Sequence, residues 1–369
     1  MAGKYRFSFG PWNIHEGADP FGPPVRESFD FEEKLKVYKK LGFTGIQFHD
    51  DDAVPDLDNL SSGQAVRRAR EVKKRLDDLG LVAEFVAPRL WEHPRTIDGG
   101  YTSNNPRERR YAIDRSLVAA DIARALGCDK MVLWLAREGT YIREAKNPVT
   151  AVERIVEAID AVLAHNRRIK VLIEPKPNEP MDQAYIPTIG AAVATGYLTR
   201  DPKRVGALLE SAHAILAGLD PSDEMAYAMA HGKLWSVHLN DQNGLKYDQD
   251  KSFGSTNIRC GFNQVRVLED NGFGKNGEFV GLDVKVMRTQ KREDSFKHLA
   301  NSLEVFHHLL EKVRTLDRRE ERQYIQARDY EGLDAFILRH LMGTKRRRVS
   351  SVNSRGTRRR VARKKSARS

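Results

Sequence analysis

The chain has 369 residues, with 62 Lys or Arg against 51 Asp or Glu and a formal net charge of +11. Residues 345–369 hold twelve of the basic side chains and no acidic one, so residues 1–344 carry 50 basic and 51 acidic groups. The excess positive charge therefore lies in the C-terminal segment, and the rest of the chain is nearly neutral. No apolar run reaches the roughly 18 residues that a membrane-spanning helix needs.

Short apolar segments alternate with amphipathic segments along the nearly neutral body. The apolar segments predict strands at 4–10, 45–51, 81–88, 130–136, 170–177, 205–210, 234–240 and 281–286. Between them, apolar residues three or four positions apart predict helices, most clearly at 31–42, 64–80 and 151–166. Regular alternation of this kind implies parallel strands joined by helical crossovers.

Eight strand–helix units favour a closed (β/α)₈ TIM barrel, an α/β fold, over an open doubly wound sheet. We expect a catalytic barrel domain at 1–315, a short C-terminal helical arm at 316–344 and a disordered basic tail at 345–369. In such barrels the active site lies at the C-terminal ends of the strands. The side chains that follow each predicted strand are therefore the candidates for chemistry.

Carboxylate and imidazole side chains lie at these predicted strand ends or in the loops after them, and two lie inside their strands, His238 in the seventh and Asp283 in the eighth. They are His49, Asp52, Glu174, Glu210, His213, His238, Asp248, Asp250 and Asp283. Each has a structural alternative when taken singly: a helix cap, a core histidine or a solvated loop. Together they would place several acidic groups in one barrel mouth, which requires compensating positive charge. Their oxygen and nitrogen donors suit Mg²⁺, Mn²⁺ or Co²⁺, and they are numerous enough for two divalent cations that share a carboxylate.

A lysine accompanies this cluster. Lys176 stands two residues after Glu174 and therefore on the same face of the predicted strand. We interpret it as a cation that polarises a substrate oxygen, with a surface lysine as the alternative.

Longer motifs run through the chain in order. They are SFGPW, DPFG, FHDDD, WEHP, DGGYTSNN, LWLAREG, IEPKPNEP, LNDQNGLKYDQD and LDVK, and they span about residues 4–285. In these motifs the sequence resembles the xylose isomerases, which are metal-dependent aldose–ketose isomerases with a TIM barrel. The resemblance implies interconversion of D-xylose and D-xylulose, and of D-glucose and D-fructose, by a metal-assisted 1,2-hydride shift after ring opening.

The resemblance also implies a role for individual residues. His49 matches the ring-opening base, Asp52 the carboxylate that orients it, and Lys176 the substrate-polarising lysine. The structural metal site matches Glu174, Glu210 and Asp283, and the second metal site matches Glu210 as a bridge with His213, Asp248 and Asp250. The substrate-binding aromatics match Trp12, Trp91 and Trp134, and Phe21 matches a residue inserted into a neighbouring subunit. The Phe21 match implies a homodimer or homotetramer, and the family's activity implies a small aldose as the substrate.

The sequence departs from the family pattern in two places. His238 stands where the seventh strand usually carries an aspartate ligand, which removes one negative charge and favours Mn²⁺, Co²⁺ or Zn²⁺ over Mg²⁺. Ala87, Pro88 and Arg89 replace small hydroxyl and amide residues near the sugar. These departures leave a related TIM-barrel isomerase or epimerase of another sugar as the alternative function.

Two other classes of function remain as alternatives. An inactive barrel could serve as a scaffold for a nucleic-acid-binding tail, and a metal-dependent nuclease could use a similar barrel, although the matched ligands and tryptophans argue against both. The tail either binds a polyanion weakly or is a solvated extension. Cys128 and Cys260 are too few for a disulfide framework, and the N-terminus has no secretory signal, so we expect a cytoplasmic protein without membrane attachment.

Overall fold

A closed barrel of eight parallel strands forms the body of the chain in a computed structural model that describes residues 5–19 and 21–344. Around the barrel the strands follow the order β1-β10-β9-β8-β6-β4-β3-β2. Their bounds are β1 Arg6–Phe9, β2 Gly45–His49, β3 Val82–Ala87, β4 Lys130–Trp134, β6 Lys170–Glu174, β8 Val205–Glu210, β9 Leu234–Leu239 and β10 Phe279–Leu282. The predicted (β/α)₈ TIM barrel is confirmed.

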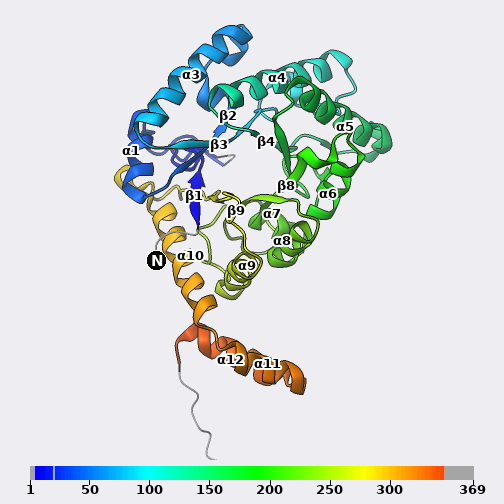
Figure 1. The fold of residues 1–369 in the computed structure, drawn as a ribbon. Coiled ribbons are helices and arrows are strands. Elements are labelled where there is room, and N and C mark those ends of the chain that lie inside the picture. The colour runs from blue at the N-terminus through cyan, green and yellow to red at the C-terminus, as the bar shows by residue number, and fades with distance from the viewer. Residues whose placement is uncertain (1–4, 20, 345–369) are drawn as a thin grey trace, which may run out of the picture. The chain divides into compact units, whose positions relative to one another are not determined.

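Helices surround the strands as an outer layer (Figure 1). Those of the barrel are α1 Phe31–Leu41, α2 Asp50–Ala53, α3 Ser62–Asp78, α4 Pro106–Ala125, α5 Pro148–His165, α6 Ile189–Leu198, α7 Ser211–Leu216, α8 Pro221–Ala230, α9 Ile258–Asp270 and α10 Lys297–Thr315. Side-chain caps begin several of them: Ser61 accepts from Gln64 N, and Asn147 accepts from Val149 N and Thr150 N. Because of these caps, α3 and α5 begin two and three residues before the apolar periodicity that predicted them.

The eighth predicted strand differs most from the sequence-based expectation of 281–286. Pairing in β10 runs from Phe279 to Leu282, so Asp283 is the first residue after the strand and Lys285 lies beyond it. Past Leu282 the chain leaves the ladder, and Lys285 N donates instead to Asp250 O at 2.7 Å. Asp283 therefore stands at a strand exit, the position that faces the barrel mouth.

A polar layer lies inside the barrel below this mouth. The Glu84 carboxyl group on β3 is buried and accepts hydrogen bonds from Ser8 Oγ, from Ser236 Oγ at 2.6 Å and from Gln47 Nε2 at 3.3 Å. These partners come from β1, β9 and β2, so one buried acid joins four strands across the interior. Hydrogen bonding of this kind offsets the cost of burying the carboxyl group.

Gly281 in β10 leaves room for this layer. A Cβ at this position would lie 2.3 Å from Gln47 Nε2 and 2.7 Å from Val237 O. We expect Gly281→Ala to lower the free energy of unfolding by about 1–3 kcal/mol, because a backbone carbonyl cannot move aside cheaply. Urea unfolding measures this. Gly63→Ala in α3, where a Cβ meets nothing within 4 Å, is the control and should be neutral or stabilising by up to about 1 kcal/mol. Equal effects at the two sites would contradict the steric argument.

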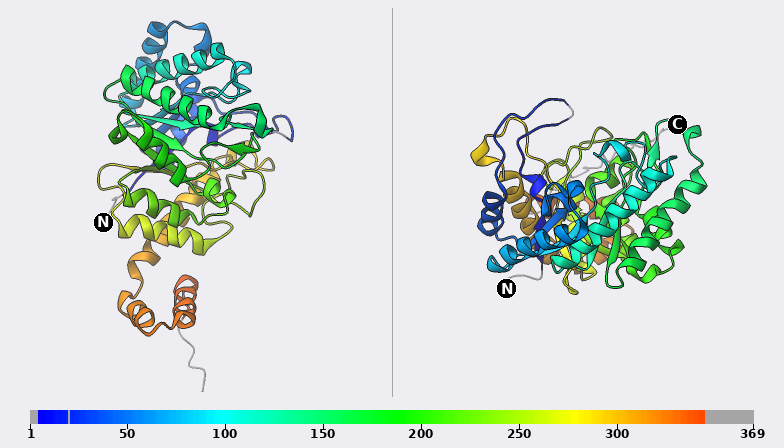
Figure 2. Two further views of the ribbon diagram at one scale, coloured as in Figure 1. Left: turned by 90° about the vertical axis from the view of Figure 1, so that its right-hand side faces the viewer. Right: turned by 90° about the horizontal axis from the view of Figure 1, so that it is seen from above.

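The loop between β1 and α1 carries Phe21 and projects beyond the barrel as the dark blue segment in both views of Figure 2. A second feature outside the barrel is the antiparallel pair of β5 Gly139–Thr140 and β7 Gln183–Ala184.

The chain divides into two compact units between Thr315 and Leu316. In the second unit, α11 Arg318–Ala327 and α12 Tyr330–Met342 pack together, with the Tyr324 and Phe336 ring centroids 5.7 Å apart. The basic tail at 345–369 lies outside the described residues, so its disorder stays a prediction. Among the described residues, no helix is both long and apolar enough to cross a membrane.

Candidate functional site

Buried carboxylates and imidazoles meet at the C-terminal mouth of the barrel. They form three groups of potential cation ligands, in each of which one atom per residue lies within 4.8 Å of the others. The groups are Glu174 with Glu210 and His213, Glu210 with His238 and Asp283, and Glu210 with Asp248 and Asp250. Donors bound to one divalent cation at about 2.0–2.6 Å lie up to about 5 Å apart, so each group fits around one ion. Glu210 belongs to all three groups and is the shared carboxylate.

His238 faces the carboxylates from β9. Its Nδ1 lies 3.3 Å from Glu210 Oε2, 3.4 Å from Glu174 Oε1 and 3.7 Å from Asp283 Oδ2. Three carboxylates, from β6, β8 and the exit of β10, therefore surround one imidazole nitrogen. Asp241, three residues further on, turns away and accepts from the backbone N–H groups of Thr256 and Asn257.

The charges of this cluster are not balanced by the protein. Burial raises the pKa of Glu210 to about 8, and burial together with Asp248 raises the pKa of Asp250 well above its ordinary value. Burial also opposes the charge of Glu174, but His238 outweighs it and lowers the pKa of Glu174 to about 2. Burial lowers the pKa of His238, yet Glu174 and Glu210 raise it well above its ordinary value. The raised pKa values of Glu210, Asp250 and His238 reflect an excess of buried acidic groups over cationic groups.

Unpaired buried atoms support the same fit to a cation. Among the described residues, Asp248 Oδ1 and His213 Nδ1 are buried and have no hydrogen-bond partner. His213 Nε2 lies 3.2 Å from both Glu210 Oε1 and Asp248 Oδ2. An unsatisfied carboxylate oxygen and a surplus of acidic groups are what a divalent ion corrects, so the residues present fit one or two such ions.

Lys176 reaches the edge of this cluster from the exit of β6. Its Nζ lies 2.9 Å from Asp248 Oδ2, 3.2 Å from Glu179 Oε2 and 5.1 Å from the centroid of the Trp134 ring. Burial lowers the pKa of Lys176, but Asp248 and Glu179 outweigh it, so the net pKa is raised and the ammonium stays charged. The lysine is buried, which contradicts the alternative of a surface lysine.

The predicted tryptophans connect the potential cation ligands to His49. Trp12 Nε1 donates to Asp283 Oδ1 at 3.0 Å, and the Trp12 ring centroid lies 4.1 Å from that of His49. The His49 ring also contacts the Trp91 ring at a centroid distance of 5.0 Å, and the Trp91 ring contacts the Trp134 ring at 4.6 Å. Together with the Trp134–Lys176 contact, these pairs form a wall of aromatic and polar groups around part of the mouth.

His49 and Asp52 lie together at the exit of β2, and Arg89 joins them. His49 Nδ1 lies 2.9 Å from Asp52 Oδ2 and 2.7 Å from Arg89 Nη2. Arg89 also donates to Asp52 Oδ1 at 3.0 Å and to Asp51 Oδ1 at 2.8 Å. Asp52 is therefore a carboxylate held between a histidine and an arginine.

Phe21 does not join these residues in the single chain. Its side chain is 76 % exposed and contacts the Tyr247 ring, with centroids 5.6 Å apart. An interaction of Phe21 with a neighbouring subunit stays a prediction.

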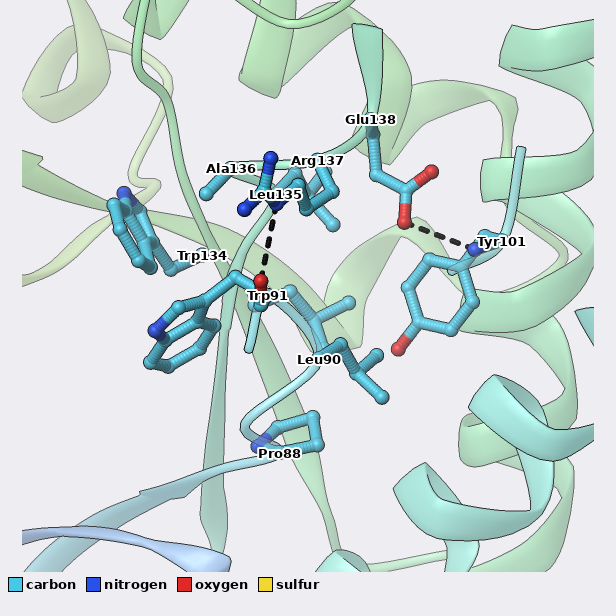
Figure 3. A pocket seen from close by; sticks show the side chains of 10 residues that line it. Pro88, Leu90, Trp91, Tyr101, Trp134, Leu135, Ala136, Arg137 and Glu138 are labelled. Carbon is cyan, nitrogen blue, oxygen red and sulfur yellow. Dashed lines mark hydrogen bonds between the residues drawn. The ribbon is translucent and has the colours of Figure 1, made fainter. Parts of the chain in front are cut away.

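A small cavity beside the tryptophans is not the candidate site. Figure 3 shows Trp91 and Trp134 side by side, Arg137 donating to Trp91 O at 3.0 Å, and Tyr101 N donating to Glu138 Oε1 at 2.9 Å. The cavity measures about 10 Å³, which holds one water molecule at most. None of the metal-ligand groups lines it, so we place the site at the open mouth.

The sequence-based candidates omitted Asn240. Its Nδ2 donates to Glu210 Oε1 and to Asp283 O, both at 2.9 Å, while its Oδ1 accepts from Ala212 N at 2.7 Å. Asn240 therefore orients the shared carboxylate. The signal was available, because Asn240 stands two residues after His238 and so on the same face of the chain. Arg89 was noted only as a departure, and its contacts to His49, Asp51 and Asp52 had no sequence signal.

Comparisons with known proteins agree with this fold. A family described as xylose isomerase-like TIM barrel matches residues 35–304, well over half of the chain. Among solved structures, a 3-keto-D-glucoside 4-epimerase from E. coli is 14 % identical over 82 % of this chain and 99 % of its own, with a TM-score of 0.59. A D-psicose 3-epimerase from Clostridium cellulolyticum H10, solved with D-tagatose, is 14 % identical over 83 % of this chain and 99 % of its own, with a TM-score of 0.57. The IolI protein with a bound zinc atom is 14 % identical over 84 % of this chain and 99 % of its own, with a TM-score of 0.58.

Proposed function

Because the chain belongs to the xylose isomerase-like TIM barrel family, we propose that it is a metal-dependent isomerase or epimerase of a small sugar. The observation that carries this proposal is that three groups of potential cation ligands meet in the barrel mouth and share Glu210, with His238 Nδ1 within 3.7 Å of Glu174, Glu210 and Asp283. Two of the similar structures are sugar epimerases and a third holds zinc, which favours an epimerase over a xylose isomerase.

A divalent cation bound to this cluster would act as a Lewis acid on substrate oxygens and stabilise negative charge on them. The chain's own residues would position the sugar. Lys176 offers a charged donor to a substrate oxygen, and the apolar faces of Trp12, Trp91 and Trp134 pack against the carbon skeleton and exclude water.

Carboxylates on two sides of the cluster supply groups for proton transfer. Glu174 enters from β6 and Asp283 from the exit of β10, with β8 and β9 between these strands. A proton next to the sugar carbonyl can therefore leave to a carboxylate on one side and return from the other, which inverts that carbon. The sugar oxygens stay held by the lysine and by the groups around His49 during this exchange.

The experiment is a sugar conversion assay in D₂O. The protein is stripped with a chelator and reloaded with Mn²⁺, Co²⁺, Zn²⁺ or Mg²⁺, and D-psicose, D-tagatose, D-fructose, D-glucose and D-xylose are followed by NMR. We expect cation-dependent epimerisation of a keto sugar with solvent deuterium at the inverted carbon, because a proton on a carboxylate exchanges with solvent. The chelated protein is the control. If the protein converts none of these sugars with any of the four cations, the proposal is refuted.

A second candidate is xylose isomerase itself, with the aldose–ketose reaction of D-xylose. The observation that favours it is the contact of Lys176 with Asp248, which joins the residue matched to the substrate-polarising lysine to one matched to the second metal site. The same assay separates the two candidates, because a 1,2-hydride shift keeps the hydrogen within the sugar. D-Xylulose formed without deuterium would support this candidate over the epimerase.

A further inference from the structure

The ring nitrogen Nδ1 of His49 has two neighbours, one of which requires a proton on Nδ1 and the other a lone pair. Asp52 Oδ2 lies 2.9 Å away and would accept a proton carried on Nδ1. Arg89 Nη2 lies 2.7 Å away. A guanidinium only donates, so this contact requires a lone pair on Nδ1. An imidazole nitrogen has one position in the ring plane, which holds either the proton or the lone pair.

The remaining hydrogen bonds favour the lone pair. Asp52 Oδ1 accepts from Arg89 Nη2 at 3.0 Å, and Asp52 Oδ2 accepts from the backbone N–H of His49 at 3.2 Å. Both carboxylate oxygens therefore have donors without the imidazole. Nη2 carries two hydrogens, one for Asp52 and one for His49 Nδ1. A proton on Nδ1 would instead place two hydrogens against each other across 2.7 Å.

Arg89 is held so that it cannot withdraw from this contact easily. Nε donates to Asp51 Oδ1 at 2.8 Å, Nη1 donates to Glu92 Oε1 at 3.2 Å, and the backbone N–H donates to Asp50 Oδ1 at 3.1 Å. Burial lowers the pKa of Arg89, but Asp52 and Asp51 outweigh it and raise it, so the guanidinium stays charged. All of its nitrogens are thus directed by carboxylates from the 50–52 segment and from its own loop.

We propose that Arg89 is a positioning residue that holds His49 in the neutral tautomer with the proton on Nε2. No described residue makes a hydrogen bond to Nε2, and the ring contacts both Trp12 and Trp91. The Nε2–H group is therefore free to donate to an oxygen of a bound molecule. This inference rests on the proposed function for its consequence: His49 donates to a sugar carbonyl or hydroxyl oxygen and is not the ring-opening base that the family resemblance implies.

The test is ¹⁵N NMR of the full chain labelled on histidine and loaded with Zn²⁺, which is diamagnetic. His49→Gln identifies the His49 resonances by their loss. We expect a lone-pair shift for Nδ1 and a protonated shift for Nε2 near neutral pH. A protonated Nδ1 in the unsubstituted protein would overturn the inference without any need for a variant to fold.

Two variants separate positioning from general structure. Arg89→Met removes the donor and keeps an apolar stem, so the proton should move to Nδ1 and bond to Asp52, exchanging the two ¹⁵N shifts; added guanidinium ion should reverse the exchange. Glu92→Gln is the control, because it removes a partner of Nη1 and leaves the Nη2 contacts in place. An Arg89→Met protein with unchanged shifts would refute the role of Arg89. None of these readouts requires a sugar, so they stand or fall separately from the proposed function.

Discussion

Glu210→Gln is expected to weaken binding of a divalent cation strongly while leaving the metal-free protein folded. Glu210 belongs to all three ligand groups, with Oε1 3.2 Å from His213 Nε2 and Oε2 3.3 Å from His238 Nδ1. The amide loses one anionic oxygen that every group shares. Since partners outside the ligand shell already contribute about 10–100-fold to metal affinity, we expect a loss of more than about 100-fold here, with sugar turnover falling at least as much. Calorimetric titration with Mn²⁺ measures the affinity.

The metal-free fold should tolerate this change, because burial raises the pKa of Glu210 to about 8 and a neutral amide resembles the protonated acid. Glu179→Gln is the matched control in the same mouth. Glu179 Oε2 lies 3.2 Å from Lys176 Nζ but belongs to none of the ligand groups, and its side chain is 37 % exposed. Glu179 Oε2 also accepts from the backbone N–H of Asp248 at 3.0 Å, and Gln keeps an acceptor oxygen there, so we expect a loss of at most about 10-fold in affinity. Equal losses in the two variants would mean that overall charge, not ligation, sets the affinity.

Arg115→Met is expected to destabilise the protein by about 3–5 kcal/mol, because it leaves a buried carboxylate without its cation. Asp50 is fully buried, and Arg115 donates to both of its oxygens, Nε to Oδ2 at 2.8 Å and Nη2 to Oδ1 at 2.9 Å. Asp50 Oδ1 also accepts from the backbone N–H of Arg89, so the pair supports the segment that carries His49. Urea unfolding measures the loss.

Arg110→Met is the control on the same helix. Arg110 and Asp114 form a pair at 3.0 Å whose side chains are 74 % and 50 % exposed, so its removal should cost less than about 1 kcal/mol. A cost at Arg115 no larger than at Arg110 would contradict the buried-pair argument.

The pH dependence of the Arg115→Met protein provides a second check. Burial raises the pKa of Asp50 even with Arg115 present, so the folded state binds this proton more tightly than the unfolded state does. For such a group, stability falls as pH rises from the unfolded pKa towards the folded one. Loss of Arg115 raises the folded pKa further, so the deficit relative to the unsubstituted protein should be larger at pH 8 than at pH 5.

The barrel was predictable because its signals are local. Each of the eight predicted strands forms, and the helices occupy the amphipathic segments between them. The predicted elements differ from the structure at their boundaries, as at α5, where Asn147 and Pro148 begin the helix before the apolar period starts, and the short β5–β7 pair was not predicted. Caps and strand exits depend on a few side-chain contacts, which periodicity does not report.

The convergence of the candidate ligands followed from the same signals. Parallel strands in a closed barrel bring their C-terminal ends together, so Glu174 and Glu210 had to share a mouth once the strands were identified. Asp283 was predicted inside its strand, and only the structure places it at the exit. Which of these ligands share an ion did not follow. Nor did the position of His238 Nδ1 among three carboxylates, because a side chain inside a strand could equally have packed into the core.

The amino-acid sequence by itself determined the fold class, the confinement of the excess positive charge to residues 345–369 and the gathering of acidic groups at one end of the barrel. Each of these depends on composition, period or strand order. Only the tertiary structure decided that Glu210 is common to all three ligand groups, that Asn240 orients it, and that Arg89 competes with Asp52 for His49 Nδ1. These features depend on differences of a few tenths of an ångström between side chains from different strands. Barrel closure and rotamers set such distances, and neither is written in the spacing of residues along the chain.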